Sequence, residues 1–181
     1  MANGVTDRRP RQAFAEKGAW NFMAENKPRF DLATINNTYT FGPIPRSLES
    51  LKQINTSNVR IHNLMTGKMR DKIEPTAPVF TFVDARDVAL AHVRAMTVPE
   101  AGGKRFYIVG GFFSNPKLAN IIRFAHPELQ DKLPSPNVED DFPQDHWKFD
   151  TTRSRQILGL EYTPLEKSVR DTVESILKAQ A

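Results

Sequence analysis

Two pairs of closely spaced carboxylates are the residues of this sequence whose types and spacing best suit proton transfer. Asp84 and Asp87 follow the apolar run 79–83, and Glu139 and Asp141 lie in an acidic run further along. Neighbouring carboxyl groups can divide the roles of acid and base when their environments separate their pKa values. At a helix start, however, an aspartate serves as N-cap and an acid three residues later completes a capping box. We therefore expect the first pair to cap a helix and the second to be solvated.

The residues needed for thiol, zinc or serine-hydrolase chemistry are absent from the sequence or not suitably spaced. The chain has no cysteine, which excludes a thiol nucleophile, a disulfide framework and a cysteine-based zinc site. The histidines do not pair at ligand spacing on one helix face; they are His62, His92, His126 and His146. No G-x-S-x-G elbow is present, so a hydrolase triad has no support.

Charge and hydropathy limit the partners. The net charge is +4 and the basic residues are scattered apart from three arginines near the N-terminus, so we expect no nucleic-acid partner. No apolar stretch approaches the length of a membrane span, and the first 30 residues have no apolar segment typical of a signal peptide. We expect a cytoplasmic protein that is not bound to a membrane.

The first elements form one α/β step. Residues 1–12 have no periodicity and are expected to be a disordered tail, with one folded unit over 13–181. A helical stripe follows; it consists of Phe14, Ala15, Gly18, Ala19, Phe22 and Met23. Pro28 marks the end of this helix. The apolar run Leu32–Ile35 then predicts a buried strand, followed by a loop.

The rest of the chain alternates strands and helices in the same way. Strands are expected at 79–83 and near 104–109, and helices are expected after Asp84 and from Asn115-Pro116. His92 is expected to pack on the inner face of the helix that follows Asp84. A short helix ends at Gly159, and the last helix has an apolar stripe; its members are Leu165, Val169, Val173 and Ile176. This alternation predicts an α/β fold.

Several of these segments, in this order, resemble the C-terminal half of the extended short-chain dehydrogenase/reductases, a group related to the epimerase/dehydratase family. The similarity is narrowest to the dihydroflavonol-reductase-like branch, which includes fungal NADPH-dependent aldehyde and ketone reductases. The segments that carry it are AFAEKGAWNF at 13–22, INNTYTFGPIP at 35–45, FVDARDVALAHVRAM at 82–96, GGKRFYIVGG at 102–111 and TTRSRQILGLEYTPLEKSVRDTVESIL at 151–177. The resemblance implies an incomplete doubly wound, Rossmann-like sheet remnant with the small C-terminal substrate domain.

The cofactor and catalytic motifs of that family have no counterpart in this sequence. Such reductases hold NADPH on a glycine-rich turn at a helix N-terminus, and no G-x-G-x-x-G occurs here. Their Tyr-x-x-x-Lys pair supplies the proton and orients the nicotinamide ribose. By the resemblance, the tyrosine and lysine positions fall at Arg8 and Gln12, neither of which can replace the original group. We therefore expect no catalytic residue in this chain.

The resemblance also implies where remnants of the site lie. The family's loop after the first strand begins Asn-Pro and contacts the nicotinamide end of the cofactor, whereas here Asn37 replaces the proline. Asn37, Thr38 and Tyr39 are the expected vestigial cofactor surface. Phe41 and Phe82 are candidates for the substrate pocket, although core packing is an alternative role for these rings.

Three hypotheses for function follow from the resemblance. The first is a truncated NADPH-dependent ketone or aldehyde reductase homologue that is inactive alone and does not bind NADPH by itself. The second is a working ketoreductase subunit, acting on a small carbonyl substrate in fungal secondary metabolism, that another chain completes. The third is a non-enzymatic binding or scaffold protein. A sheet missing its neighbouring strands also predicts self-association through an exposed edge.

Overall fold

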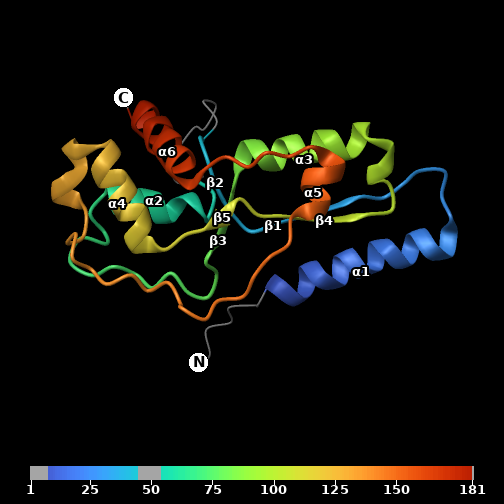
Figure 1. The fold of residues 1–181 in the computed structure, drawn as a ribbon, viewed down its shortest axis with the longest axis horizontal. Coiled ribbons are helices and arrows are strands. Elements are labelled where there is room, and N and C mark those ends of the chain that lie inside the picture. The colour runs from blue at the N-terminus through green and yellow to red at the C-terminus, as the bar shows by residue number, and fades with distance from the viewer. Residues whose placement is uncertain (1–7, 45–53, 181) are drawn as a thin grey trace.

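The computed structural model describes residues 8–44 and 54–180 as an α/β structure with two small sheets (Figure 1). The helices are α1 (Arg8–Asn26), α2 (Asn58–Met65), α3 (Ala85–Thr97), α4 (Asn115–Ala125), α5 (Thr152–Leu158) and α6 (Leu165–Gln180), with 3-10 turns η2 (Pro99–Ala101) and η3 (Pro127–Lys132). The strands are β1 (Thr34–Asn37), β2 (Tyr39–Phe41), β3 (Thr81–Asp84), β4 (Arg105–Ile108) and β5 (Gly111–Phe112). The predicted α/β class with a partial parallel sheet is confirmed.

The two sheets are joined by two short connections, Thr38 between β1 and β2 and residues 109–110 between β4 and β5. β1 pairs in parallel with β4, with Thr34 opposite Arg105. β2 pairs in parallel with β3, and β5 adds to β3 in the antiparallel sense. Only Thr38 separates β1 from β2, so the chain passes from one sheet directly into the other.

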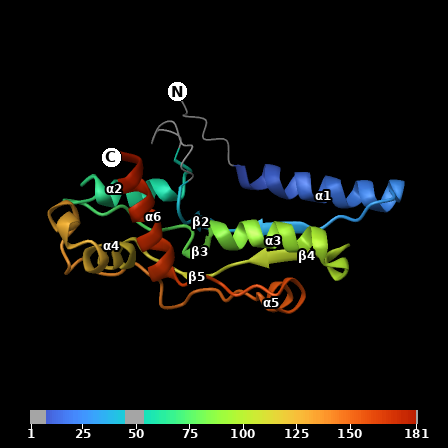
Figure 2. The same ribbon diagram turned by 90° about the horizontal axis from the view of Figure 1, so that it is seen from above.

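Helix α3 packs on one face of the β1–β4 sheet, and α1 lies on the opposite side (Figure 1). In Figure 1, α3 lies above these strands and α1 below them, and Figure 2 places α1 beyond β1 on the side away from β4. The helices α2, α4 and α6 gather at the other end of the molecule (Figure 1). We refer to α2, α4 and α6 with the loops between them as the helical lobe.

The main apolar core lies in the helical lobe, where the predicted stripe of α6 is fully buried, its members being Leu165, Val169, Val173 and Ile176. They pack with Leu118 and Ile122 of α4 and with Leu64 of α2 in one cluster. A smaller cluster lies between α3, α5 and β4, around Phe106 and Leu158.

Local signals in the sequence set several element boundaries as expected. Asp84 is the N-cap of α3, and its carboxylate accepts a hydrogen bond from the Arg86 backbone N–H at 2.8 Å. Pro116 lies in the first turn of α4, where its missing N–H has no cost. Gly159 ends α5 in the left-handed conformation, with φ of 61°.

The N-terminal helix differs from the expectation in two ways. α1 begins at Arg8, so residues 8–12 are helical and do not form part of a disordered tail; residues 1–7 lie outside the described part. The predicted stripe is also not buried, because Phe14 and Phe22 are 72% and 49% exposed. The side chain that contacts the sheet is instead the polar Glu16, which no apolar periodicity can indicate.

Candidate functional site

The candidate site is an open cavity of about 690 Å³ where β1 and β2 end and α3 begins. Its walls come from the segment after β1, from the residues before α2 and from the first turn of α3; the lining residues are Asn37, Thr38, Thr40, Gly42, Pro43, Ile44, Ile54–Asn58, Ala85 and Val88. The carboxyl ends of parallel strands are where open α/β sheets bind ligands. The position of the cavity therefore follows from the topology.

Hydrogen bonds hold the segment after β1 in place. The Thr38 hydroxyl lies 2.6 Å from the Thr81 hydroxyl and donates to the Thr81 carbonyl at 2.9 Å. The Thr40 backbone N–H donates to the Ser57 hydroxyl at 3.1 Å, and the Asn55 amide donates to the Thr40 carbonyl at 3.0 Å. One wall is thus tied both to β3 and to the residues before α2.

Gly42 is the closest approach between this segment and α3. Its φ is 133°, and a Cβ atom there would lie 3.0 Å from both the Cβ and the N of Ala85. A side chain at this position therefore meets both a backbone penalty and a steric one. The Gly42 N–H donates to the Thr172 hydroxyl at 2.9 Å, which anchors the segment to α6.

Asn58 supplies the one unsatisfied acceptor in the described wall of the cavity. Its side-chain amide donates to the Gly42 carbonyl at 2.9 Å, while its Oδ1 is buried and has no partner among the residues that the structure describes. A buried acceptor without a partner costs stability, so the bond from the Asn58 amide to Gly42 holds this part of the wall at some cost.

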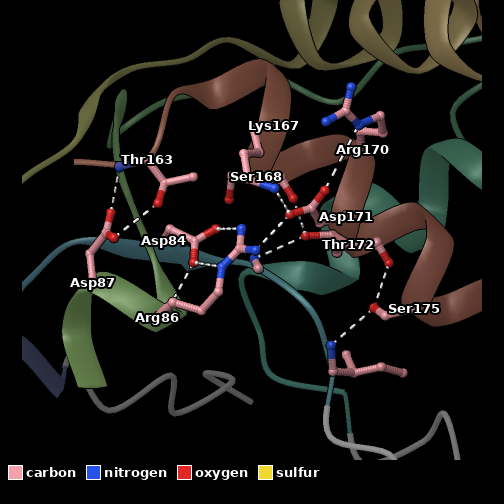
Figure 3. Close-up of polar contacts among 12 residues, drawn as sticks. Asp84, Arg86, Asp87, Thr163, Lys167, Ser168, Arg170, Asp171, Thr172 and Ser175 are labelled. Carbon is pink, nitrogen blue, oxygen red and sulfur yellow. Dashed lines mark hydrogen bonds and ion pairs between the residues drawn. The ribbon is translucent and has the colours of Figure 1, made fainter. Parts of the chain in front are cut away.

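A charged network joins the start of α3 to α6 next to the cavity (Figure 3). The fully buried Asp84 carboxylate accepts from Arg86 Nε at 2.8 Å and from Arg86 Nη2 at 2.9 Å. Arg86 Nη1 also donates to Asp171 of α6 at 2.6 Å, and Lys167 donates to the same oxygen at 2.8 Å. The network links the start of α3 to α6 across the molecule.

Ionisation of Asp84 is governed by two opposing effects. Burial acts to raise the pKa of Asp84, but the hydrogen bonds from Arg86 outweigh it and hold the pKa below its ordinary value. The same balance, with Lys167 and Arg86 as donors, lowers the pKa of Asp171. Both groups are therefore ionised structural partners at neutral pH and do not act as proton donors.

Known proteins match the chain along nearly its whole length, although no family model matches it. Ketoreductase azaE of Aspergillus niger is 46% identical over 170 residues, which is 94% of this chain and 50% of that protein. The crystal structure of Gre2 in complex with NADPH from Candida albicans superposes with a TM-score of 0.87 at 35% identity, covering 100% of this chain and 54% of that chain. The chain is homologous to the C-terminal half of the extended short-chain reductases.

Plant proteins extend the comparison. Cinnamoyl-CoA reductase CAD2 of Medicago truncatula is 35% identical over 91% of this chain and 46% of that protein. Vestitone reductase from alfalfa, at 15% identity and a TM-score of 0.62, supports the fold alone. The chain spans about half the length of the curated relatives that it matches.

In this reductase homologue, two of the three expected cofactor residues line the cavity and the third does not. Asn37 and Thr38 line the cavity, and their role as a cofactor surface stays a prediction. Tyr39 does not line it: the ring packs edge-on against Phe113 with centroids 5.6 Å apart, and the Arg60 guanidinium lies 5.0 Å from its centroid. The alternation of side chains along β2 places Tyr39 on the core side.

The two candidate substrate-pocket rings are core residues. Phe41 and Phe82 are 0% and 2% exposed, with ring centroids 6.1 Å apart. Neither ring lines the cavity, and their assignment to a substrate pocket stays a prediction. The alternative of core packing is the one that the structure supports.

Asp87 and His92 also differ from their predicted roles. Asp87 accepts from the backbone N–H and the hydroxyl of Thr163, at 2.8 and 2.9 Å, in place of completing a capping box (Figure 3). Burial raises the pKa of Asp87, although these two bonds partly oppose the shift. His92 is exposed, with Nδ1 2.8 Å from the Val88 carbonyl oxygen, and is not packed in the core.

The structure also shows which site residues sequence reasoning missed. Gly42, Asn58 and Thr172 meet at one point although 16 and 130 positions separate the bonded residues. A glycine followed by proline after a strand was the one local signal for this turn. No helix in the described ranges is long and apolar enough to cross a membrane, and no acidic or histidine cluster suited to a metal ion occurs within them.

Proposed function

We propose that this chain supplies the substrate-side half of an NADPH-dependent carbonyl reductase and does not transfer hydride by itself. The observation that carries the proposal is the cavity, whose wall is built from Asn37, Thr38 and Gly42, the segment that resembles the nicotinamide-facing loop of the family. Relatives named as a ketoreductase and as methylglyoxal reductases support the substrate class, a small ketone or aldehyde.

The residues of the cavity fit only one end of NADPH. The polar wall at Asn37 and Thr38 is compatible with the amide group of the nicotinamide carboxamide. The diphosphate end has no glycine-rich turn in this sequence to receive it. When bound, NADPH supplies the hydride, and the role of this chain is to shape the pocket around the carbonyl group.

The proton donor is the second missing part. Family tyrosine and lysine positions correspond to Arg8 and Gln12, four residues apart within α1, so the helix that would present them is formed. Arginine stays protonated throughout the physiological range and glutamine carries no charge. The chain alone thus retains a scaffold for the reaction without its acid.

A titration of the purified chain with NADPH, followed by cofactor fluorescence, tests the inactive part of this proposal. We expect no saturable binding below about 100 μM, because most of the affinity for a dinucleotide comes from contacts that this chain lacks. Full-length Candida albicans Gre2, crystallised with NADPH, is the positive control. Saturable binding at a few micromolar would contradict the proposal.

A chimera tests the substrate-side part. The N-terminal half of Candida albicans Gre2, up to and including the lysine of its Tyr-x-x-x-Lys motif, is joined to residues 13–181 of this chain, so that α1 continues the catalytic helix. We expect NADPH-dependent reduction of small ketones or aldehydes, weakened by Asn58→Ala and not by Lys117→Ala on the distant α4. A folded chimera that binds NADPH and reduces no carbonyl compound would instead favour the non-enzymatic binding hypothesis.

A further inference from the structure

Residues 42–44 form a part of the cavity wall that no strand pairing supports. The pairing of β2 with β3 stops just before this segment. Gly42 and Ile44 are buried, and both line the cavity. Their backbone N–H groups are removed from water and therefore need acceptors elsewhere in the molecule. Pro43, which lies between them, has no N–H to satisfy.

Helix α6 supplies an acceptor for each of these two N–H groups. The Gly42 N–H donates to the Thr172 hydroxyl at 2.9 Å. The Ile44 N–H donates to the Ser175 hydroxyl at 3.0 Å. Each hydroxyl gives its own proton to a carbonyl of the helix: Thr172 donates to Ser168 at 2.6 Å, and Ser175 donates to the Thr172 carbonyl at 2.7 Å. Because these protons are used within α6, the oxygen lone pairs are left to accept from the cavity wall.

A second wall of the cavity is attached to the same helix. Ala85 and Val88, at the start of α3, line that wall. Arg86, between them, donates from Nη1 to the Asp171 carboxylate at 2.6 Å. Asp171 precedes Thr172 directly in α6, and Figure 3 shows both side chains beside Arg86. One helix thus holds both the start of α3 and the segment 42–44.

The contacts to the cavity walls use a different face of α6 from the one that packs in the helical lobe. Val173 and Ile176 belong to the apolar stripe, which is buried in the lobe. Asp171, Thr172 and Ser175 lie three or four positions from one another or next to one another, which places them on an adjacent face. The rigidity of the apolar core can therefore reach the cavity wall through the polar face of this helix.

The segment 42–44 carries part of the apolar lining of the cavity. Pro43 and Ile44 line it together with Ile54 and Val88. Apolar lining in a ligand pocket suits the hydrocarbon part of a ligand, and the polar groups fix its orientation. A shift of residues 42–44 should therefore act mainly on the hydrocarbon substituent of a bound carbonyl compound.

We propose that Thr172 and Ser175 are positioning residues that hold residues 42–44 against the hydrocarbon substituent of the carbonyl substrate. Neither side chain lines the cavity, so both act through the backbone of Gly42 and Ile44. Loss of either hydroxyl leaves a buried N–H without an acceptor, and the segment then has to move toward water. The identity of the ligand rests on the proposed function, whereas the position of the wall rests on these hydrogen bonds.

Amide hydrogen exchange in the full chain tests the position of the wall without requiring activity. In Thr172→Val we expect the Gly42 N–H to exchange at least about tenfold faster, because its acceptor is lost while the shape of the side chain is kept. The Gly110 N–H, which donates to the Phe82 carbonyl at 2.7 Å, is the internal reference and should keep its wild-type rate. Thr172→Ser retains the hydroxyl and should restore slow exchange at Gly42.

Two further variants separate positioning from a general loss of stability. Val173→Ala weakens the apolar face of α6, and its side chain makes no hydrogen bond to the wall. It should therefore change the exchange of the two glycine amides to the same degree. Ser175→Ala, at a half-buried position, keeps the test decisive if Thr172→Val does not fold. It should speed exchange at Ile44 by at least about tenfold.

Kinetics of the chimera described above test the effect on the substrate. A yeast Gre2 structure is named as that of a methylglyoxal/isovaleraldehyde reductase, and these two aldehydes differ in the size of their hydrocarbon group. In the chimera, Thr172→Val should raise the KM for isovaleraldehyde at least about fivefold and that for methylglyoxal less than about twofold. The kcat should change little for both, since hydride and proton come from the other half. Thr172→Ser should behave like the wild type.

Three results would overturn the proposal. One is faster exchange in Thr172→Val that is equal at Gly42 and Gly110, and another is a Thr172→Ser variant that behaves like Thr172→Val. The third is an active chimera in which Thr172→Val leaves the KM for isovaleraldehyde unchanged. An inactive wild-type chimera contradicts the proposed function, and the role in reduction is lost with it. The exchange rates still decide whether α6 holds the wall.

Discussion

The helical lobe and the unit formed by α1 and β1 are stabilised in opposite ways. In the helical lobe, α2, α4 and α6 bury a continuous apolar cluster in which Leu118 and Val173 are fully covered. No side chain of α1 between Gln12 and Asn26 is buried. The helix is held to the strands by Glu16, whose carboxylate accepts from Thr34 at 3.0 Å and from Arg105 at 2.7 Å.

This difference indicates which part of the structure is stabilised by its own apolar core. An apolar core contributes stability that needs no further partner, whereas a helix held by a few polar contacts depends on whatever else covers it. The chain has two tryptophans: Trp20 is in α1, and Trp147 lies against Phe112 of β5 with ring centroids 6.3 Å apart. A Trp147→Phe variant therefore leaves Trp20 as a reporter of α1.

The largest expected effect is in the helical lobe. Leu118→Ala removes a fully buried side chain between α4 and α6 and should lower the free energy of unfolding by about 3 kcal/mol. Urea denaturation followed by circular dichroism measures it, with the exposed neighbour Lys117→Ala as control. A loss below about 1 kcal/mol would show that the lobe is not the stable part of the molecule.

Arg86→Ala should have the next largest effect, because it leaves the buried Asp84 carboxylate without its main partner. We expect a loss of about 2 kcal/mol, less than the full cost of breaking a buried pair since Arg86 itself is 43% exposed. The same urea experiment measures it. Arg170→Ala is the control. It removes a cation that lies 3.8 Å from Asp171, at the outer limit of an ion pair, and should change stability little.

Acidification should narrow the difference between the wild type and Arg86→Ala. The pKa values of Asp84 and Asp171 are lowered in the folded state, so their contribution is present above the ordinary carboxyl pKa of about 3.8 and is lost as the pH falls through the lowered values. Asp87 acts in the opposite sense, since its raised pKa makes its contribution decline as the pH rises through it. Unfolding free energies from pH 7 to pH 3 test this; a gap that stays constant would argue against it.

A smaller effect is expected at the polar anchor of α1. Glu16→Gln removes the charge that Arg105 stabilises, and the hydrogen bond from Arg105 is the main reason that the pKa of Glu16 is lowered. We expect a loss of about 1 kcal/mol, confined to the Trp20 fluorescence transition in the Trp147→Phe background. Glu25→Gln, an exposed carboxylate on the same helix, should leave that transition in place.

The smallest effect should come from Phe22→Ser on the outer face of α1. Its ring is 49% exposed, so its loss should change the unfolding free energy of the monomer by less than about 0.5 kcal/mol. Dilute urea titrations measure this. A loss above about 1 kcal/mol would mean that α1 is packed more tightly than its exposure indicates.

The features that the sequence predicts correctly depend on neighbours along the chain. The N-cap at Asp84, the proline in the first turn of α4 and the left-handed Gly159 are each decided within about four residues. The α6 stripe is predicted because burial on one helix face has a period of 3.6 residues. The resemblance to extended reductases correctly predicts the fold that these elements build.

The features that the sequence does not predict depend on contacts between segments far apart along the chain. Asp87 has a capping-box position, yet it bonds to Thr163, 76 positions away. Phe14 and Phe22 have helical spacing, but periodicity does not say whether a partner covers the stripe. From the sequence, Glu16 is indistinguishable from an ordinary surface carboxylate. Its partner Arg105 lies 89 positions away along the chain, and only the structure shows the hydrogen bond between them.

Thr38 links the β1–β4 sheet to the cavity more closely than their separate descriptions suggest. It is the one residue between β1 and β2, and its hydroxyl is tied to Thr81. The pairing of β1 with β4 and a ligand in the cavity therefore act on the same short segment, which includes Asn37. Thermodynamic reciprocity then requires that a ligand which binds the cavity only when this segment is in place also stabilises the pairing of β1 with β4.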